Sequence, residues 1–218
     1  MRAGNVIGGG NWAPYKGEIV KDYFLKYHSL NSDISVHIAT GQASYVNTHS
    51  EDWIIHMIDT GQNTLTGGRL HRLENLLRPH GTFMLTYGDG VSSVDIRALV
   101  DFHRQHGKLA TVTAVRPPAR FGEIVLDENQ VVDFHEKPQI GEGWINGGFF
   151  VFEPGVFDYL HGDQIELEKE PLENLVSDGQ LIAFKHYDFW YPMDTVRDRN
   201  YLNNEWIKGT AQWKVWED

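Results

Sequence analysis

The sequence predicts a layered α/β fold. Short apolar stretches alternate along the chain with longer amphipathic segments, a rhythm that favours helices packed on a sheet over an all-α or all-β fold. Apolar residues make up 41% of the chain and charged residues 22%, the balance of a globular domain. A chain of 218 residues buries about 70% of its unfolded surface and needs no stabilising cross-links.

The predicted strands are short and apolar. They are residues 34–39, 53–58, 82–87, 109–115, 131–136, 145–152 and 181–186. No internal repeat, low-complexity segment or Pro/Ser-rich linker interrupts their succession, so we expect a single domain.

Helices are predicted between these strands. The clearest is residues 95–106, which places Ile96, Leu99 and Val100 on one face and ends before Gly107. A second helix follows Thr66, with leucines at helical spacing as far as residue 77. Three more are predicted at residues 18–27, 167–177 and 195–208.

The net charge of the chain is −11, because 30 acidic residues outnumber 19 lysines and arginines. This balance argues against a non-specific nucleic-acid binder, which needs a basic face to displace counterions from phosphates. A small anionic substrate stays compatible with it, since a few local cations or a metal ion can reverse the field at one site.

The chain has no cysteine, which excludes disulfides, cysteine-zinc sites and thiol catalysis. No stretch approaches the ~18 apolar residues of a membrane span, and the N-terminus shows no apolar signal segment. We therefore expect a cytoplasmic protein with no membrane partner.

The eleven histidines do not suggest a metal site. His103 and His106 stand three apart on the predicted helix, but nothing else falls at ligand spacing, and structural zinc takes four ligands. We expect core or surface roles for them. No Gly-x-Ser-x-Gly elbow is present, which argues against an α/β-hydrolase.

Asp89 is the first candidate for chemistry. The predicted strand 82–87 is followed by Gly88-Asp89-Gly90. Ligands of open α/β sheets gather at the carboxyl ends of strands, so an acid placed there between flexible glycines suits a metal–phosphate complex. The alternative is an ordinary Gly-Asp-Gly turn.

Asp194 is the second carboxylate at such a junction, between an aromatic strand and the last helix. It could be the N-cap of that helix, with Thr195 beside it. Two carboxylates from distant chain positions, completed by substrate phosphates and waters, would also suit Mg²⁺, which seldom uses an all-protein cage.

Two further strands end in polar residues. Glu136-Lys137-Pro138 holds a lysine at a strand terminus, where it either binds a phosphate or forms a surface ion pair. Asn146 and Gly147 begin an Asn-Gly-Gly-Phe-Phe strand. Two glycines there indicate a bulge or the close approach of a ligand, with Asn146 able to bond sugar hydroxyls.

The loop of residues 60–69 leads into a helix through Thr66, Gly67, Gly68 and Arg69. Free amide groups at a helix start, together with an arginine, can meet an anion. An ordinary Thr-capped helix is the alternative, and the sequence weighs the two equally.

Six motifs in register resemble glucose-1-phosphate cytidylyltransferases, from about Tyr15 to the end of the chain. Each is weak alone, but their shared order over some 200 residues is specific. They are Gly61-x4-Thr66-Gly-Gly-Arg-Leu70, Tyr87-Gly-Asp-Gly-Val91, Arg120-Phe-Gly122, Glu136-Lys-Pro138, Asn146-Gly-Gly-Phe-Phe-Val151 and Pro192-Met-Asp-Thr195.

This resemblance implies a nucleotide-diphospho-sugar transferase (Rossmann-like) fold, a three-layer mixed sheet, and a place in nucleotide-sugar and O-antigen lipopolysaccharide biosynthesis. The partners would be CTP and α-D-glucose 1-phosphate, converted into CDP-glucose and pyrophosphate. Asp89 and Asp194 would hold Mg²⁺, and Lys137 would hold the sugar phosphate. Glu136 and Asn146 would contact glucose hydroxyls.

The implied substrate-binding residues also include Gly88, Gly147 and the loop from Thr66 to Arg69, and this loop would lie near the nucleotide. Tryptophans near the C-terminus, among them Trp206 and Trp213, favour packing onto the domain or an identical neighbour, and the family also suggests a homo-oligomer.

The family's first strand and its loop Gly-Gly-x-Gly-Thr-Arg-Leu are not found in this sequence. We therefore expect a truncated domain from residue 15 onward, preceded by a foreign or disordered segment, residues 1–14. Residues 2–13 resemble an internal stretch of CDP-glucose 4,6-dehydratases. Gly8-Gly9-Gly10 is not expected to replace the phosphate loop, because no strand is predicted before it and no Thr-Arg-Leu follows.

Two functional interpretations follow. In one, the chain is a cytidylyltransferase impaired by the missing phosphate loop, which normally grips the triphosphate. In the other, it is a non-catalytic remnant that binds sugar phosphate or associates with intact subunits. A dehydratase is disfavoured because no Tyr-x-x-x-Lys is present.

Overall fold

The computed structural model describes residues 5–8, 17–47, 53–117, 123–127, 130–135 and 143–216. Contacts divide the chain into two compact units. Unit 1 comprises Met1–Asn75 and Leu160–Lys169, and unit 2 comprises Leu76–Tyr159 and Glu170–Asp218. The sequence predicted one domain with no linker, and the chain passes between the two units three times without one. The predicted boundary at residue 15 stays a prediction.

Unit 1 begins with a short parallel sheet. β1 (Asn5–Gly8) pairs in parallel with β4 (Ile55–Ile58). A strand therefore does precede the glycines that follow residue 7, and that part of the argument against a phosphate loop was wrong. Gly9 and Gly10 lie outside the described residues.

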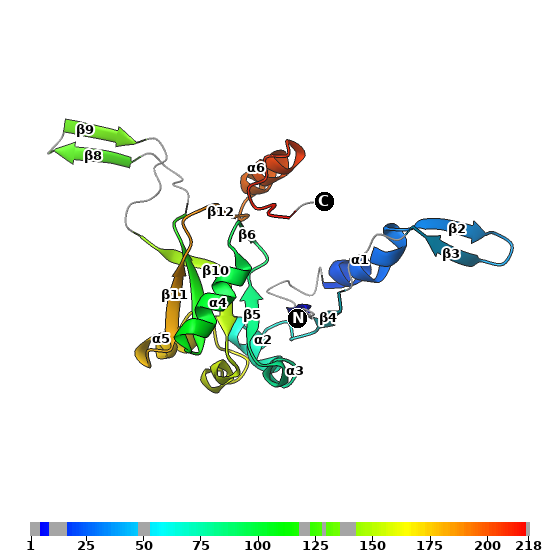
Figure 1. The fold of residues 1–218 in the computed structure, drawn as a ribbon, viewed down its shortest axis with the longest axis horizontal. Helices are drawn as coiled ribbons and strands as arrows, with labels where there is room; N and C mark the ends of the chain where they lie inside the picture. Colours follow the sequence, from blue (N-terminus) through cyan, green and yellow to red (C-terminus); the bar gives the residue numbers. More distant parts are fainter. Residues whose placement is uncertain are drawn as a thin grey trace. The chain divides into compact units, whose positions relative to one another are not determined.

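A helix and a hairpin follow in unit 1 (Figure 1). The helix α1 spans Gly17–Leu30, slightly longer than predicted, and none of its residues is buried. The hairpin pairs β2 (Asp33–His37) with β3 (Gln42–Val46), and Gly41, at a φ of 70°, supplies the left-handed turn. The sequence predicted the first strand and missed the second.

The helix predicted after Thr66 is broken into three pieces: α2 (Thr66–Arg72), α3 (Glu74–Leu77) and the 3₁₀ turn η1 (Arg78–His80). Leu70 and Leu73 are buried, as their spacing predicted. Leu73 ends α2, and the proline within η1 cannot donate a backbone hydrogen bond, which limits helical continuation.

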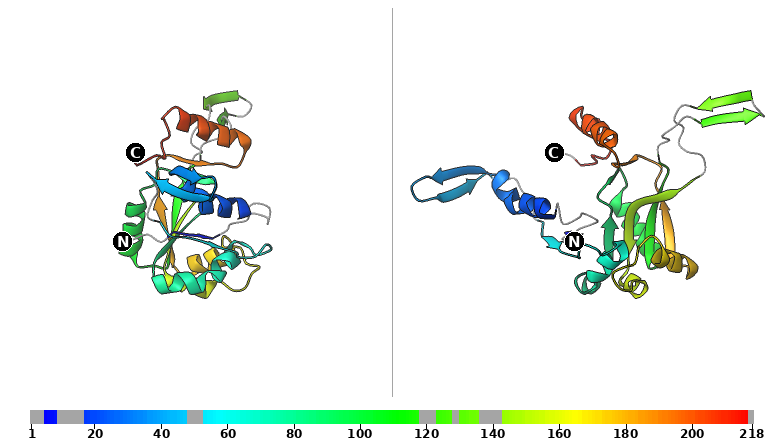
Figure 2. Two further views of the ribbon diagram at one scale, coloured as in Figure 1. Left: turned by 90° about the vertical axis from the view of Figure 1, so that its right-hand side faces the viewer. Right: turned by 180° about the vertical axis from the view of Figure 1, so that it is seen from behind.

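Unit 2 is built on a four-stranded mixed sheet with the order β11-β7-β10-β5 (Figures 1 and 2). Its strands are β5 (Phe83–Thr86), β7 (Ala110–Val115), β10 (Ile145–Phe152) and β11 (Leu181–Lys185), all of them predicted. β7 and β11 are parallel, and β10 runs antiparallel to β7 and β5. The strands β5, β7 and β11 thus share one direction.

The helix α4 (Ile96–His106) packs on one face of this sheet. Asp95 caps it by accepting hydrogen bonds from the backbone N–H groups of residues 97 and 98, and Gly107 ends it in the left-handed conformation. The ring of Phe102 meets Phe184 of β11 edge to face, 5.4 Å between centroids. The core nearby is aromatic, with Phe83, Phe150, Phe152 and Phe157 in mutual contact.

The remaining elements of unit 2 flank the sheet. They are β6 (Gly90–Ser92), β8 (Glu123–Asp127), β9 (Gln130–His135), η2 (Pro154–Tyr159), α5 (Glu170–Ser177), β12 (Trp190–Pro192) and α6 (Val196–Ile207). β6 pairs with β12, and β8 with β9. Among the described residues, no helix has the length and apolar character needed to cross a membrane.

Candidate functional site

The carboxyl ends of β5, β7 and β11 lie at one edge of the unit 2 sheet, because these strands share a direction. We call it the carboxyl edge. The segment after β5 carries Gly88 and Asp89, and the antiparallel strand β10 begins there with Ile145 and Asn146. This is where ligands of open α/β sheets bind.

The structure brings Asp89 and Asp194 together from distant chain positions. The ladder between β6 and β12 pairs Gly90 with Pro192. One step further, the N–H of Met193 donates to the carbonyl oxygen of Asp89 at 2.6 Å. The backbones at Asp89 and Asp194 are therefore adjacent, and both side chains are exposed.

Asp194 is not the N-cap of α6, so the interpretation of this residue as a helix cap is wrong. Thr195 occupies that position, and its hydroxyl accepts a hydrogen bond from the N–H of Asp198 at 3.2 Å. The Asp198 carboxylate in turn accepts from the N–H of Thr195 at 3.0 Å, which completes a capping box. The helix start is therefore capped without Asp194.

Gly88 and Asp89 form a turn, as the simpler interpretation predicted. A Cβ built on Gly88 would meet nothing within 4 Å, and this glycine has no left-handed φ. Neither packing against the described residues nor backbone conformation requires a glycine here. Its small size leaves open space beside Asp89, where a ligand would have room.

The Asn-Gly-Gly segment forms the bulge that the sequence predicted. The register of β10 against β7 shifts between Asn146 and Phe150. The Asn146 side chain accepts a hydrogen bond from the N–H of Gly148 at 2.8 Å, and Gly148 has a φ of 77°. A Cβ on Gly147 would lie 2.7 Å from Val115 and 2.9 Å from the carbonyl oxygen of Thr113, so packing alone requires this glycine.

Trp190 is a structural residue of this edge that the sequence analysis missed. Its indole N–H donates to the carbonyl oxygen of Gly147 at 2.8 Å and so ties β12 to the bulge. The dense aromatics of this segment gave the signal, because a tryptophan at a glycine-rich strand usually seeks a polar partner.

The Thr66–Arg69 segment of unit 1 is engaged internally. The N–H groups of Gly67 and Gly68 both donate to the carbonyl oxygen of Ile165, at 2.9 and 3.2 Å. A Cβ on Gly68 would lie 2.4 Å from the carbonyl oxygen of Asp163. These amides are not free for an anion, and the glycines admit the segment around residue 165.

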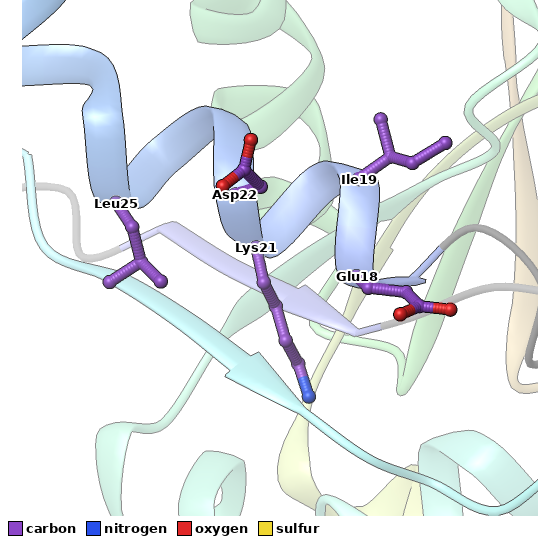
Figure 3. Close-up of a pocket in the computed structure, with 5 residues that line it drawn as sticks. All are labelled: Glu18, Ile19, Lys21, Asp22 and Leu25. Atoms are coloured by element: carbon purple, nitrogen blue, oxygen red, sulfur yellow. The ribbon is translucent and has the colours of Figure 1, made fainter.

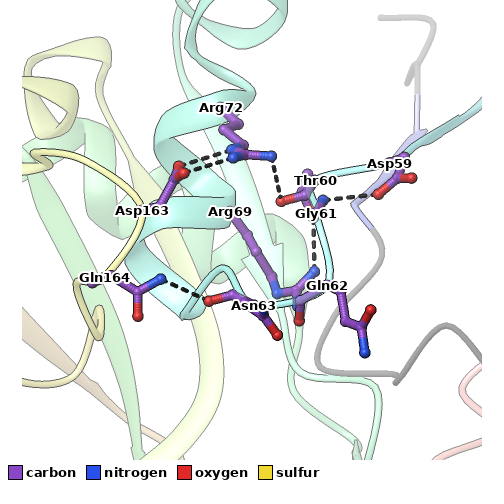
Figure 4. Close-up of polar contacts among 9 residues, drawn as sticks. All are labelled: Asp59, Thr60, Gly61, Gln62, Asn63, Arg69, Arg72, Asp163 and Gln164. Atoms are coloured by element: carbon purple, nitrogen blue, oxygen red, sulfur yellow. Dashed lines mark hydrogen bonds and ion pairs between the residues drawn. The ribbon is translucent and has the colours of Figure 1, made fainter.

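The side chains around α2 are also bonded within unit 1 (Figure 4). Arg69 donates to the Thr60 hydroxyl at 2.9 Å. Arg72 holds the Asp163 carboxylate through two hydrogen bonds, of 2.8 and 2.6 Å, and reaches the Thr60 carbonyl oxygen at 3.1 Å. The Arg72 guanidinium keeps the pKa of Asp163 below its usual value.

Thr66 is not the cap of α2 either, since Leu65 occupies that position without a side-chain bond. The Thr66 hydroxyl donates to Glu168 at 2.7 Å and accepts from the N–H of Leu167 at 2.9 Å. Neither interpretation of this segment, the anion loop or the Thr-capped helix, describes its bonding.

Some predicted site residues lie in segments that the structure does not describe. Glu136 and Lys137, like the Arg120-Phe121-Gly122 motif, lie outside the described residues. Among all described residues, no three His, Asp or Glu side chains are grouped as a metal site would need.

A hollow in unit 1 offers no alternative site. Figure 3 shows its lining along α1, which is Glu18, Ile19, Lys21, Asp22 and Leu25. All five side chains are exposed and project from one helix. None of the predicted site residues is among them.

His103 and His106 have a structural role at the opposite, amino edge of the unit 2 sheet. Lys108 N–H donates to His106 Nδ1 at 2.9 Å, so the neutral ring carries its proton on Nε2 and donates to Thr111 Oγ1 at 2.7 Å. The Thr111 hydroxyl then donates to His103 Nδ1, also at 2.7 Å. His103 Nε2 donates to Glu153 at 3.3 Å.

In this series of hydrogen bonds, each donor meets an acceptor when both histidine rings are neutral. Burial lowers the pKa of His103 below its ordinary value, against the opposing effect of Glu153. Burial also lowers the pKa of His106. The prediction of core roles for these histidines agrees with this geometry.

The fold and this edge define a class of protein. The family model described as nucleotidyl transferase matches residues 55–198. The chain therefore belongs to the nucleotidyl transferase family and is a homologue of glucose-1-phosphate cytidylyltransferases.

The sequence relatives point to one branch of that family. The chain is 45% identical over 203 residues to the glucose-1-phosphate cytidylyltransferase of Salmonella typhi, which covers 93% of this chain and 79% of the relative. A probable glucose-1-phosphate cytidylyltransferase of Bacillus subtilis is 38% identical over the same shares. The mannose-1-phosphate guanylyltransferase catalytic subunit beta of Dictyostelium discoideum is 31% identical over 63% of this chain and 39% of its own.

Solved structures support the fold. HddC from Yersinia pseudotuberculosis superposes with a TM-score of 0.55 at 20% identity, over 88% of this chain and 75% of its own. A putative glucose-1-phosphate thymidylyltransferase from Bacillus anthracis reaches 0.52 at 16% identity, over 76% and 67%. The α/β fold is confirmed, as is the resemblance from about residue 15 onward. The dehydratase-like origin of residues 2–13 stays a prediction.

Proposed function

We propose that this chain is a glucose-1-phosphate cytidylyltransferase-type enzyme, which transfers CMP from CTP to α-D-glucose 1-phosphate. The products are CDP-glucose and pyrophosphate. The observation that carries the proposal is the backbone contact of Asp89 with Met193, which places Asp89 next to Asp194 at the carboxyl edge, beside the open space at Gly88. The 45% identity to a cytidylyltransferase supplies the substrate class.

The donor set fits Mg²⁺. Two exposed carboxylates on adjacent backbones leave several coordination positions for substrate oxygens and water, which this ion prefers. Asp89 and Asp194 would hold the ion, and its charge would neutralise the phosphates in an otherwise acidic protein.

The chain's own residues would position the substrates. Asn146 would contact glucose hydroxyls together with Glu136, and Lys137 would hold the sugar phosphate. That phosphate then attacks the α-phosphorus of CTP, and the bond to the leaving pyrophosphate breaks as the new P–O bond forms.

Turnover by this chain should be low. The 218 residues contain no Gly-x-Gly-Thr-Arg-Leu, and the segment between β1 and α1 therefore lacks that phosphate loop. That loop would supply donors to the triphosphate, and each lost transition-state donor costs about 3 kcal/mol. The alternative, a remnant that binds sugar phosphate without turnover, shares the same edge.

Pyrophosphate release from CTP, glucose 1-phosphate and Mg²⁺ separates these two functions. We expect slow release that depends on all three components. Binding of glucose 1-phosphate with no release would favour the remnant. Release within a few-fold of the Salmonella typhi relative would contradict the proposed impairment.

A further inference from the structure

A cationic aromatic cluster lies at the carboxyl edge, apart from the two acidic residues. The guanidinium of Arg116 lies 5.0 Å from the ring centroid of Trp144, and the Lys185 ammonium lies 5.5 Å from it. Tyr187 meets the same ring edge to face at 5.1 Å. We call these four residues the Trp144 patch.

The strand register places the patch on the same face of the sheet as Asn146. Ala114 of β7 is paired with Asn146 on one side and with Lys185 on the other. Arg116 and Trp144 continue the same ladder two residues away from Ala114 and Asn146, so their side chains project to the same face. The α4 helix contacts Phe184 and thus covers the opposite face.

Among the residues that the structure describes, the two cations have no carboxylate partner. In the described part of the chain, neither Arg116 nor Lys185 forms an ion pair, although the net charge is −11. The Nε atom of Arg116 is buried and has no hydrogen-bond partner there. Lys185 and Tyr187 are exposed, and Tyr187 is 65% exposed.

We propose that the Trp144 patch binds the phosphate group of a sugar phosphate, with Arg116 and Lys185 as its cations. The inference rests on the proposed function and adds residues to the site. Contact with Trp144 engages the charge of each cation through the ring face but uses none of its N–H donors, which stay available to phosphate oxygens. Asn146, on the same face, would then meet the sugar.

The test is calorimetric titration of the chain with glucose 1-phosphate. The double variant Arg116→Gln/Lys185→Gln removes both cations. We expect it to weaken binding at least tenfold, the scale of lost charge-assisted hydrogen bonds. Binding by the unsubstituted chain should also weaken with added salt.

Arg78→Gln/Lys214→Gln is the matched control. It removes one arginine and one lysine that also lie over aromatic rings of unit 2, Phe157 and Trp206, at 5.5 and 5.7 Å. Unchanged affinity in the patch variant, or an equal loss in the control, would overturn the proposal. If the double variant unfolds, Lys185→Gln alone, at an exposed position, should still weaken binding severalfold, and no change there would equally overturn it.

The pyrophosphate assay keeps this proposal distinct from the proposed function. Patch-dependent binding without pyrophosphate release would support the patch and contradict the enzyme. Release with an unchanged KM for glucose 1-phosphate in the patch variant would support the enzyme and contradict the patch.

Discussion

Units 1 and 2 each carry glycines beside polar residues, but the polar groups around them differ in what they bond. Around Gly67 and Gly68, the amides, the hydroxyl of Thr66 and the guanidinium of Arg72 all bond to residues 163–168 of the same unit. At the carboxyl edge of unit 2, the bulge at Gly147 is packed, yet the side chains of Asp89 and Asn146 beside it are exposed.

This difference shows that a glycine-rich motif indicates that another group comes close to the backbone. It does not show whether that group belongs to the protein or to a ligand. In unit 1 the close neighbour is the backbone at Asp163, 2.4 Å from a Cβ placed on Gly68. At Gly88 in unit 2 there is no close neighbour among the described residues, which leaves room for a ligand.

The largest effect is expected from a substitution in the ligand site itself. Asp89→Asn keeps the shape of the side chain and removes its charge, so Mg²⁺ would lose one of two protein carboxylates. We expect pyrophosphate release to fall at least about a hundredfold, with unchanged thermal unfolding. Asp101→Asn, an exposed residue of α4, is the control and should change neither measurement. Near-normal CDP-glucose formation by the Asp89 variant would refute the assignment.

The second prediction contrasts two glycines. Gly68→Ala forces a methyl group onto the Asp163 backbone, and overpacking of this kind costs about 1–3 kcal/mol or more. Gly88→Ala meets nothing and should leave the free energy of unfolding within about 0.5 kcal/mol, while it weakens ligand binding. Urea unfolding of both variants measures the contrast, and equal stabilities would mean that the two motifs do not differ.

The third prediction concerns the histidines at the amino edge. Their pKa values are lowered in the folded chain, so folding favours the neutral rings. As the pH falls below about 6.5, the unfolded chain takes up protons first, and stability should drop by at most about 1.4 kcal/mol per pH unit for each histidine.

His103→Gln should reduce this pH dependence, although it lowers stability at pH 7. The exposed His80, changed to Gln, is the control and should leave the slope unchanged. Urea titrations between pH 7.5 and 5 measure it. An equal slope in the His103 variant and the unsubstituted chain would show that this ring does not carry the effect.

The smallest effect is expected for two exposed ion pairs. Arg72→Lys loses the two-bond contact with Asp163 and the bond to Thr60, whereas Arg78→Lys loses one 2.8 Å contact with Asp158. We expect a slightly larger decrease in Tm for Arg72→Lys, because lysine cannot reproduce the planar fork. A larger decrease for Arg78→Lys would contradict the view that the three Arg72 contacts stabilise the chain more than the single Arg78 contact.

The sheet of unit 2 was predictable from the sequence because its strands are short apolar runs, of which β7 and β10 are largely buried. β10 was predicted with its true bounds, and the bulge that the structure shows was one of the two interpretations of Asn146-Gly-Gly. β3 was missed because its sequence, Gln-Ala-Ser-Tyr-Val, contains no run of large apolar residues. The break at Leu73 was missed because the leucine spacing continues through it.

The candidate site was predictable only as separate residues. Local patterns marked Asp89 and Asp194, but their proximity depends on the pairing of β6 with β12, strands of three residues each with no pattern of their own. Arg116 and Lys185 carry no local signal either, because the neighbours that make them a cluster come from three different strands.

The central claim is that Asp89 and Asp194 form a cation site at the carboxyl edge. An NMR experiment with Mn²⁺ in place of Mg²⁺ tests this claim most directly. We expect selective broadening of the amide signals of residues 88–90 and 193–195, lost in Asp89→Asn/Asp194→Asn. No selective broadening at these residues, or the same broadening in the double variant, would contradict the account.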